Sequence, residues 1–382
     1  MQYYGTLYFG TPPQPFTTVF STEQAWTWLN DVSCGEKCHP AVHAFNSSES
    51  STFEGTTESK EVESGSKGQG TALLAFETVR LSPKRGVVAG QAFLLMQESA
   101  GLTALSADGY TVSYTQGLAF SKLSEWHDTF LGSLKKQGLI SQAQFAFYLS
   151  NSTSPNAAQS SLSFGSYDLD KYALGNFSYI PVDSEAGLWN VPLQSLSYGR
   201  NPVENDREAV VSSGASFISI STAAYKKVQT VICQLVQCDT HYSDIVFDCG
   251  KGEESVLPEM VFRLGGQDFP LGQKYYIGRD DAKCYTLLVP TESSRDVLGY
   301  PFLRAYYTLF DAENYRIGLA PARPIPLKHK NAPVPSNSGY IWLGLGVFAV
   351  ISVLLAVWCL YSPKKTEQTT SLMEPLVRNN DD

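Results

Sequence analysis

Charged side chains are scarce in this sequence of 382 residues, because Lys, Arg, Asp and Glu together make up only 17% of it. Disordered chains are rich in charge and poor in apolar residues, whereas 43% of this chain is hydrophobic. The composition therefore excludes extensive disorder and allows a sizeable core. A basic surface is also lacking: the formal net charge is -9, and a nucleic-acid groove needs a basic stripe. We expect no nucleic-acid partner.

One long run lacks charge altogether. Ile341–Leu360 is uncharged, and about 20 apolar residues span a bilayer core. Trp342 and Trp358 lie near its two ends, where an interfacial aromatic belt would place them. A buried core helix is the less fitting alternative for so long a run. The sequence predicts three C-terminal segments: a Pro-rich stalk over 324–339, a transmembrane helix over 340–361 and a cytoplasmic tail over 362–382.

The predicted orientation is that of a single-pass type I membrane protein. Lys364 and Lys365 directly follow the apolar run, and positive residues favour the cytoplasmic side. The body before the run would then be lumenal or extracellular, and it holds three Asn-X-Ser/Thr glycosylation triplets. Their acceptors are Asn46, Asn151 and Asn176. The sequence opens without a signal peptide, so we expect the natural N-terminus to lie upstream.

Cysteine usage agrees with an oxidising compartment. Of the seven cysteines, Cys359 lies in the apolar run and six precede it. Six cysteines can form three disulfides in 15 ways. A zinc site built from Cys34, Cys38, His39 and His43 is the alternative, but a glycosylated lumenal body favours disulfides. We expect no metal and no cofactor.

The body has the pattern of an all-β protein. Short runs of β-branched and aromatic residues alternate with turn residues, and the chain holds 30 Gly and 20 Pro. Helical spacing favours only two helices, Ser124–Gln137 and Ser221–Leu235. The predicted strands are Tyr3–Phe9, Phe16–Phe20, Thr71–Leu81, Gln144–Leu149, Ser161–Phe164, Phe177–Val182, Ala209–Val211, Ile245–Phe247, Met260–Leu264 and Tyr306–Phe310.

A weak internal repeat predicts two lobes of one plan. Thr18–Ala25 is similar to Ala209–Ser216, since each is an apolar strand end followed by small polar residues. Gln116–Phe120 and Val297–Phe302 follow the two copies at similar distances. We expect an N-terminal lobe over 1–176 and a C-terminal lobe over 177–323.

Several stretches between residues 3 and 322 form a recognisable set. They are Tyr3–Gln14, Phe45-Asn46 with Ser50–Phe53, Leu257–Phe262 and, most specifically, Leu298–Asp311 with Arg316–Ala320. In these stretches the chain resembles the pepsin-like aspartic endopeptidases, the peptidase A1 type. The resemblance implies a bilobal double β-barrel with few short helices. It also implies the disulfides Cys34–Cys38 and Cys249–Cys284, and leaves Cys233–Cys238 as a third bridge by elimination.

The two catalytic positions of that family are altered here. The family carries the motif Asp-Thr-Gly-Ser/Thr once per lobe, and its two aspartates share one proton. This chain has Ser21 and Ser212 at the aspartate positions, with Glu23 in place of the first glycine. A serine hydroxyl is neither acid nor base near neutral pH, so we expect no catalytic residue. The resemblance leaves these candidates lining the cleft: Thr22, Glu23, Trp28, Ser213, Gly214 and Ser216.

Other sequence features bear on whether the chain is catalytic. The family's flap holds a tyrosine over the cleft, whereas Glu61–Gly70 holds none. A serine nucleophile would need a nearby histidine base, and no histidine lies in a matching motif. Glu23 could act as a lone carboxylate, or it could be an exposed turn residue.

We therefore predict a membrane-anchored, catalytically inactive pseudoprotease whose cleft binds an extended peptide or protein. An aspartic-type endopeptidase with an atypical active site, carrying out proteolysis, is one alternative. A structural surface glycoprotein is the other.

Overall fold

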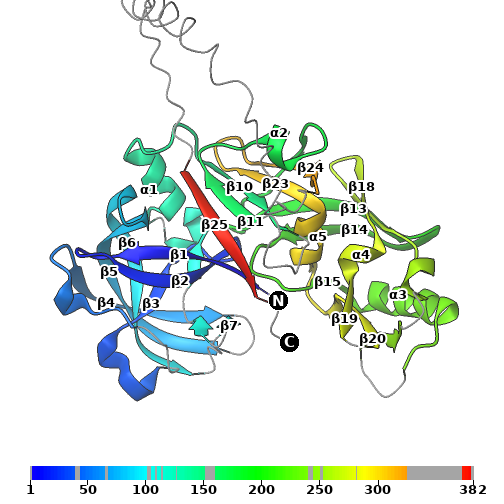
Figure 1. Cartoon of the computed structure of the whole chain (residues 1–382), viewed down its shortest axis with the longest axis horizontal. Coiled ribbons are helices and arrows are strands. Elements are labelled where there is room, and N and C mark those ends of the chain that lie inside the picture. The colour runs from blue at the N-terminus through cyan, green and yellow to red at the C-terminus, as the bar shows by residue number, and fades with distance from the viewer. Residues whose placement is uncertain are drawn as a thin grey trace, which may run out of the picture.

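The structure is a computed structural model, and it describes residues 2–38, 44–64, 68–100, 105–107, 110–112, 115–125, 127–150, 160–239, 244–249, 253–280, 282–324 and 372–379. Two β-rich lobes lie side by side, with the N-terminal lobe in blue and cyan and the C-terminal lobe in green and yellow (Figure 1). The predicted all-β class with few short helices is confirmed.

A 13-stranded sheet runs through the N-terminal lobe and continues between the lobes, in the order β12-β24-β23-β10-β11-β25-β1-β2-β9-β3-β6-β5-β4. Its N-terminal-lobe strands are β1 (Gln2–Phe9), β2 (Gln14–Ser21), β3 (Trp28–Asn30), β4 (Glu54–Ser64), β5 (Gly68–Ser82), β6 (Arg85–Ala100) and β9 (Thr115–Gly117). Its remaining strands are β10 (Gln144–Tyr148), β11 (Ser160–Phe164), β12 (Ser178–Pro181), β23 (Tyr306–Asp311), β24 (Arg316–Pro321) and β25 (Leu372–Asn379). Two strands, β7 (Leu105–Ala107) and β8 (Tyr110–Val112), form a separate hairpin.

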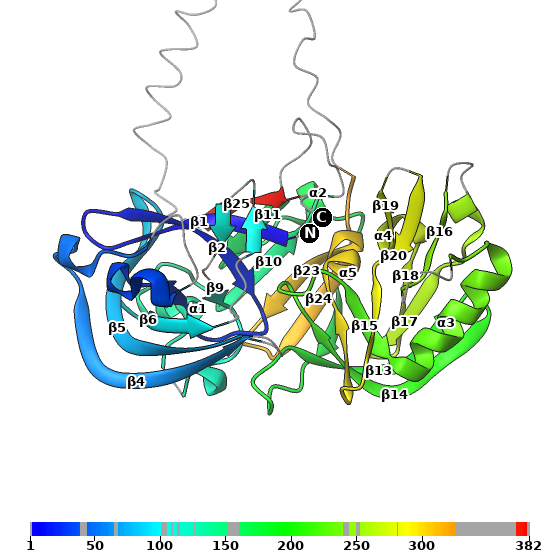
Figure 2. The ribbon, with the colours of Figure 1, turned by 90° about the horizontal axis from the view of Figure 1, so that it is seen from below.

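The C-terminal lobe holds a seven-stranded and a three-stranded sheet. The larger contains β13 (Asn190–Tyr198), β14 (Asn201–Val211), β15 (Ile218–Ser221), β17 (Met260–Leu264), β18 (Gln267–Leu271), β21 (Leu288–Thr291) and β22 (Arg295–Leu298). The smaller contains β16 (Val246–Asp248), β19 (Ile277–Asp280) and β20 (Lys283–Thr286). Seen from below, the two lobes flank the central strands β10, β23 and β24 (Figure 2). Every predicted strand run overlaps an observed strand.

The helices are short, and one of the two predictions needs correction. They are α1 (Phe130–Lys136), α2 (Leu169–Tyr172), α3 (Thr222–Leu235), α4 (Gln273–Tyr276) and α5 (Tyr300–Ala305), with 3-10 turns η1 (Val32–Lys37), η2 (Ser47–Glu49), η3 (Ser121–Ser124) and η4 (Glu253–Val256). The Ser221 hydroxyl caps α3 by accepting from the Ala224 N–H, which confirms this helix. The prediction that α1 begins at Ser124 is wrong. Glu125 is left-handed with φ 53°, and Thr129 caps a helix that starts only at Phe130.

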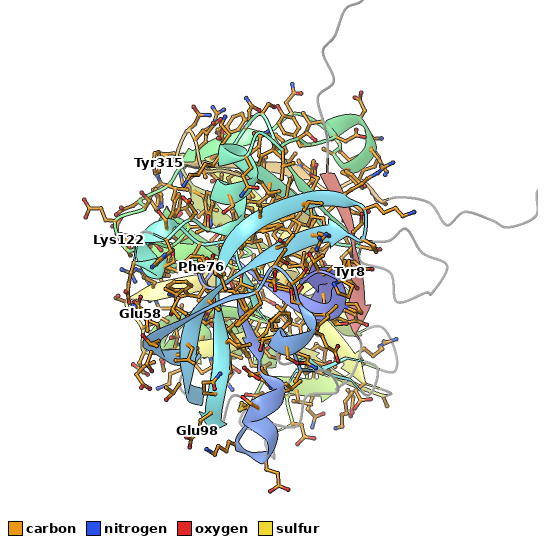
Figure 3. The ribbon with its side chains drawn as sticks, turned by 90° about the vertical axis from the view of Figure 1, so that its left-hand side faces the viewer. Tyr8, Glu58, Phe76, Glu98, Lys122 and Tyr315 are labelled. Atoms are coloured by element: carbon orange, nitrogen blue, oxygen red, sulfur yellow. A yellow bond between two sulfur atoms is a disulfide. The ribbon has the colours of Figure 1, made fainter. Side chains whose placement is uncertain are left out.

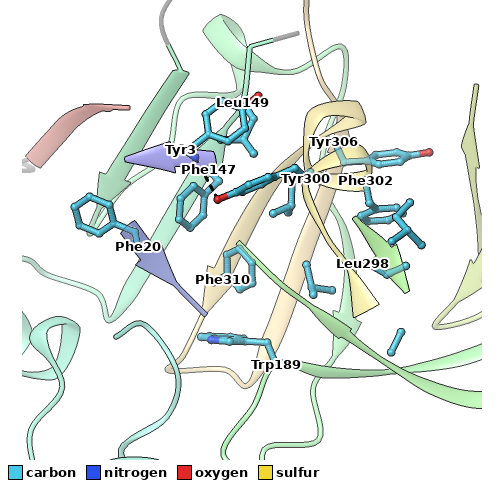
Figure 4. Close-up of a cluster of buried hydrophobic side chains, with 14 of the residues drawn as sticks. Tyr3, Phe20, Phe147, Leu149, Trp189, Leu298, Tyr300, Phe302, Tyr306 and Phe310 are labelled. Carbon is cyan, nitrogen blue, oxygen red and sulfur yellow. Dashed lines mark hydrogen bonds between the residues drawn. The ribbon is translucent and has the colours of Figure 1, made fainter. Parts of the chain in front are cut away.

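Aromatic side chains join the lobes. The Tyr3 N–H of β1 donates to the Tyr300 hydroxyl of α5 at 3.2 Å, and their ring centroids are 4.8 Å apart (Figure 4). In the same cluster Phe145 and Phe310 stack with centroids 4.8 Å apart. Aromatic pairs of this kind stabilise a core beyond their buried area. The interface between the lobes is therefore a packed core, which fixes the positions of the loops described below.

The three disulfides are Cys34–Cys38, Cys233–Cys238 and Cys249–Cys284, as predicted, with Cα–Cα distances of 5.6, 5.2 and 5.5 Å. The first pairing removes Cys34 and Cys38 as thiolate ligands, so the alternative zinc site is wrong. His39 and His43 lie outside the described residues.

The C-terminal strand β25 differs from the expected cytoplasmic tail. It lies between β11 and β1 (Figure 1). Leu372–Leu376 pair with β11, and Val377–Asn379 pair with β1. In the part of the chain that the structure describes, no helix combines the length and apolar character that a membrane crossing requires. The predicted span over 340–361 lies outside the described residues.

Candidate functional site

Two equivalent loops meet at the centre of the molecule. The first follows β2, whose last residue Ser21 is in register with Gly117 of the parallel strand β9. The second follows β14, whose last residue Val211 is in register with Leu298 of the parallel strand β22. The repeat seen in the sequence is therefore a structural repeat, with one strand end and one parallel neighbour in each lobe.

Hydrogen bonds between the lobes lock the two loops together. The Thr22 hydroxyl donates to the Val211 carbonyl at 2.9 Å and accepts from the Ser213 N–H at 3.0 Å. In the reciprocal arrangement, the Ser213 hydroxyl donates to the Phe20 carbonyl at 2.7 Å and accepts from the Thr22 N–H at 3.1 Å. Both side chains are buried. We expected Thr22 and Ser213 to line the cleft, and the structure places both side chains in the interface between the lobes, where they form hydrogen bonds across it.

The hydroxyls of Ser21 and Ser212 occupy the point where the loops meet. Ser212 is fully buried, and its oxygen accepts from the N–H groups of Gly214 and Ala215 at 3.1 and 3.0 Å. The Ser21 oxygen accepts from the Glu23 N–H at 3.3 Å. A Cβ at Gly214 would lie 2.6 Å from the Ser21 oxygen, so any larger residue there would force the Ser21 side chain to move. Neither hydroxyl can supply the acid or base of peptide hydrolysis.

Among the described residues of the two loops, Glu23 is the one whose carboxyl group reaches the place where Ser21 and Ser212 meet. Its side chain forms a hydrogen bond with Ser212, so a carboxyl from the first loop reaches the second. Burial raises the pKa of the Glu23 carboxyl, and the hydrogen bond from Ser212 offsets part of that effect. Glu23 is half-buried, so the interpretation of this residue as an exposed turn residue is wrong.

A cavity of about 200 Å³ opens beside Glu23. Its wall contains Glu23, Gln24, Ala25, Trp26, Glu61, Val62, Leu94 and Leu123. The Trp26 ring packs near that of His127, with centroids 5.3 Å apart, and the ring of Phe76 (labelled in Figure 3) lies 6.5 Å from the same imidazole. His127 makes no hydrogen bond with Ser21 or Ser212, so it cannot serve either as a base in this arrangement.

Trp28 has a buried indole N–H with no hydrogen-bond partner among the described residues. It packs in one side-chain cluster with Val62 and Leu94. The resemblance implies that a flap tyrosine would contact this tryptophan, and no tyrosine occurs in Glu61–Gly70. The unpaired indole agrees with that loss.

Of the predicted cleft residues, the structure thus brings Glu23 to the cavity and keeps Gly214 and Ser216 half-buried at the second loop. Trp28 packs with Val62 and Leu94, which belong to the cavity wall. Sequence reasoning missed the other residues of the wall. Trp26 could have been predicted, because it follows Ser21 by only five residues on the same loop. Leu94 and Leu123 could not, because they come from distant parts of the chain. Across the described residues no cluster of His, Cys, Asp and Glu is suited to a metal ion.

Comparison with known proteins agrees with this geometry. The sequence model of the family "Eukaryotic aspartyl protease" matches residues 2–322. The chain is 31% identical to pepsin A of Sus scrofa over 330 residues, which cover 84% of this chain and 81% of that protein. It is 30% identical to pepsin A of Canis lupus familiaris over 332 residues and to pepsin II-2/3 of Oryctolagus cuniculus over 331 residues, with the same coverage.

Proposed function

Because the chain belongs to the eukaryotic aspartyl protease family, we propose that it retains that family's peptide-binding cleft and has lost its ability to cleave peptide bonds. The observation that carries this proposal is the pair of hydroxyls, Ser21 and Ser212, where the two loops meet. Hydrolysis by this fold needs two carboxyls that share a proton, one as base and one as acid. The described loops bring a single carboxyl, that of Glu23, to this point.

Preserved architecture supports a binding role. The four hydrogen bonds of Thr22 and Ser213 hold the loops in register although no pair of acids remains there for them to position. The cavity beside Glu23 is lined by the polar side chains of Glu23, Gln24 and Glu61 together with apolar ones, so it offers both hydrogen-bonding groups and packing surface to a ligand. An extended peptide in such a cleft would bind through backbone hydrogen bonds and side-chain pockets.

One observation favours the competing function, an endopeptidase with an atypical site. Glu23 is a carboxyl with a raised pKa at the meeting of the loops, and perturbed acids gather at catalytic sites. A working enzyme of this kind would lose turnover on Glu23→Gln. A single carboxyl would have to act as base and then as acid without the second carboxyl that holds the shared proton in this family.

The test is an incubation of the full chain with a diverse peptide mixture from pH 3 to pH 7, read by mass spectrometry for retained peptides and for products. The Ser21→Ala/Ser212→Ala variant and the Glu23→Gln variant are run beside it. We expect retained peptides and no products. Products that vanish in either variant would establish the endopeptidase, and neither binding nor products would favour a structural surface glycoprotein.

We also propose a lumenal or extracellular body that is glycosylated and anchored by the apolar run over 340–361. Three disulfides support an oxidising compartment. Asn176 is exposed, as an acceptor has to be, whereas the side-chain oxygen of Asn46 already accepts from the N–H and the hydroxyl of Ser48. Asn151 lies outside the described residues. In the anchored form with a cytoplasmic tail, Leu372–Asn379 would have to leave its place between β11 and β1.

A further inference from the structure

Glu23 is a half-buried acid with no positive partner among the described residues. It makes no ion pair with any described residue, and burial of a carboxylate without a counter-charge is costly. Among the described residues its side chain has one polar partner, the neutral hydroxyl of Ser212. The carboxyl lines the cavity, and a carboxylate that accepts this one hydrogen bond can accept further ones from a ligand.

The cavity around Glu23 has two kinds of wall. Ala25, Val62, Leu94 and Leu123 are apolar, and Trp26 contributes a half-buried aromatic ring. A second acid, Glu61 of β4, lies on the same cavity, and no described residue of the wall carries a positive charge. At about 200 Å³ the space is smaller than the roughly 300–1,000 Å³ of sites for drug-sized ligands, so it suits one side chain.

We propose that this cavity is a subsite for a positively charged side chain, lysine or arginine, of the peptide that the cleft holds. The aliphatic stem would pack along the apolar walls, as long basic side chains do, while the cationic head binds the Glu23 carboxylate. Trp26 would add a cation–π contact. This inference rests on the proposed binding function and assigns it a class of ligand.

The pH dependence follows from the groups around Glu23. Glu61 lines the same cavity, Tyr300 of α5 lies close enough to interact electrostatically, and the His127 ring lies 5.3 Å from the Trp26 ring. A protonated Glu23 cannot bind a cation as an ion pair. Because burial raises the pKa of Glu23, affinity for a basic side chain should fall on acidification at a pH above the ordinary glutamic acid range.

The experiment uses matched peptides taken from those retained in the incubation above, with one basic residue replaced by norleucine. Binding to the full chain is measured by calorimetry from pH 4 to pH 7.5. We expect the basic peptide to bind about 10- to 100-fold more tightly at pH 7 and to lose this advantage in Glu23→Gln. Glu36→Gln, an exposed acid outside the cavity wall, should change neither affinity.

The outcomes separate the two proposals. Equal affinity for the basic and norleucine peptides, or a preference that survives Glu23→Gln with no dependence on pH, overturns the cationic subsite while leaving the binding function intact. Absence of any retained peptide overturns both. Because Glu23→Gln can be compared by its binding of the norleucine peptide, loss of folding is distinguishable from loss of the subsite.

Discussion

Replacing Asp296 by Asn should remove a pH-dependent part of the protein's stability. Asp296 of β22 is fully buried beside Glu204 and Arg207 of β14. Arg207 contacts a Glu204 oxygen at 3.1 Å and an Asp296 oxygen at 3.0 Å. The other oxygen of each carboxyl is buried and has no partner among the described residues. One proton held between the two acids would satisfy both oxygens.

The size and sign of the effect follow from this geometry. Burial and, after it, the adjacent Glu204 raise the pKa of Asp296, Arg207 lowers it, and the net result is a pKa of about 7. Since the folded pKa exceeds the unfolded value, the stabilisation is complete below about pH 4 and is lost as pH rises through 7. A change from 3.8 to about 7 corresponds to at most about 4 kcal/mol in the free energy of unfolding. Asn mimics the protonated acid, because its oxygen can accept from Arg207 while its amide donates to Glu204.

Urea unfolding at pH 4, 5, 6 and 7 measures this difference. We expect Asp296→Asn to gain stability relative to the unmutated protein as pH rises, with most of the gain between pH 5 and pH 7. The control Asp268→Asn removes an exposed acid paired with Arg263 at 2.8 Å and should show no such trend. A constant difference between Asp296→Asn and the unmutated protein across this range would refute the argument.

Three further changes test other parts of the structure. Thr22→Val and Ser213→Ala should each lower the free energy of unfolding by about 1–3 kcal/mol. In a double-mutant cycle the two losses should not add, because the two residues share one hydrogen-bond network. Additive losses would argue against a shared network. Gly299→Ala should unfold the protein or lower its melting temperature sharply, since the added Cβ would lie 2.2 Å from the Phe217 carbonyl oxygen, and a normal melting curve would contradict that packing. Deleting Leu372–Asn379 should destabilise the protein by several backbone hydrogen bonds at about 1 kcal/mol each, whereas an unchanged midpoint would mean that β25 contributes nothing to the sheet.

Local pattern predicted much of the fold. Alternation and turn residues located the strands, and the Ser221 cap located α3, because these signals lie within a few residues of the element they define. The likeness of Thr18–Ala25 to Ala209–Ser216 predicted the two equivalent loops. Ser21 and Ser212 were identified because the motif around each loop is short and continuous.

Contacts between distant segments were not predictable in this way. Nothing near Thr22 or Ser213 in the sequence indicates that their hydroxyls cross between lobes, 191 residues apart. The position of Glu23 was open for the same reason, since its burial depends on Ser212 and the cavity wall rather than on its own loop. The place of β25 also follows from the strands on either side of it, β11 and β1, and polar composition alone favoured a tail.

The most direct test of the account is to restore the missing acids and measure peptide cleavage. The unmutated full chain and the Ser21→Asp/Glu23→Gly/Ser212→Asp variant would be incubated with the same peptide mixture at pH 3 to 7, and products would be quantified by mass spectrometry. We expect no products from the unmutated chain and measurable cleavage by the variant, because the loops are already held in register by Thr22 and Ser213. Cleavage by the unmutated chain that matches or exceeds that of the variant would contradict the claim that this cleft binds peptides without cutting them.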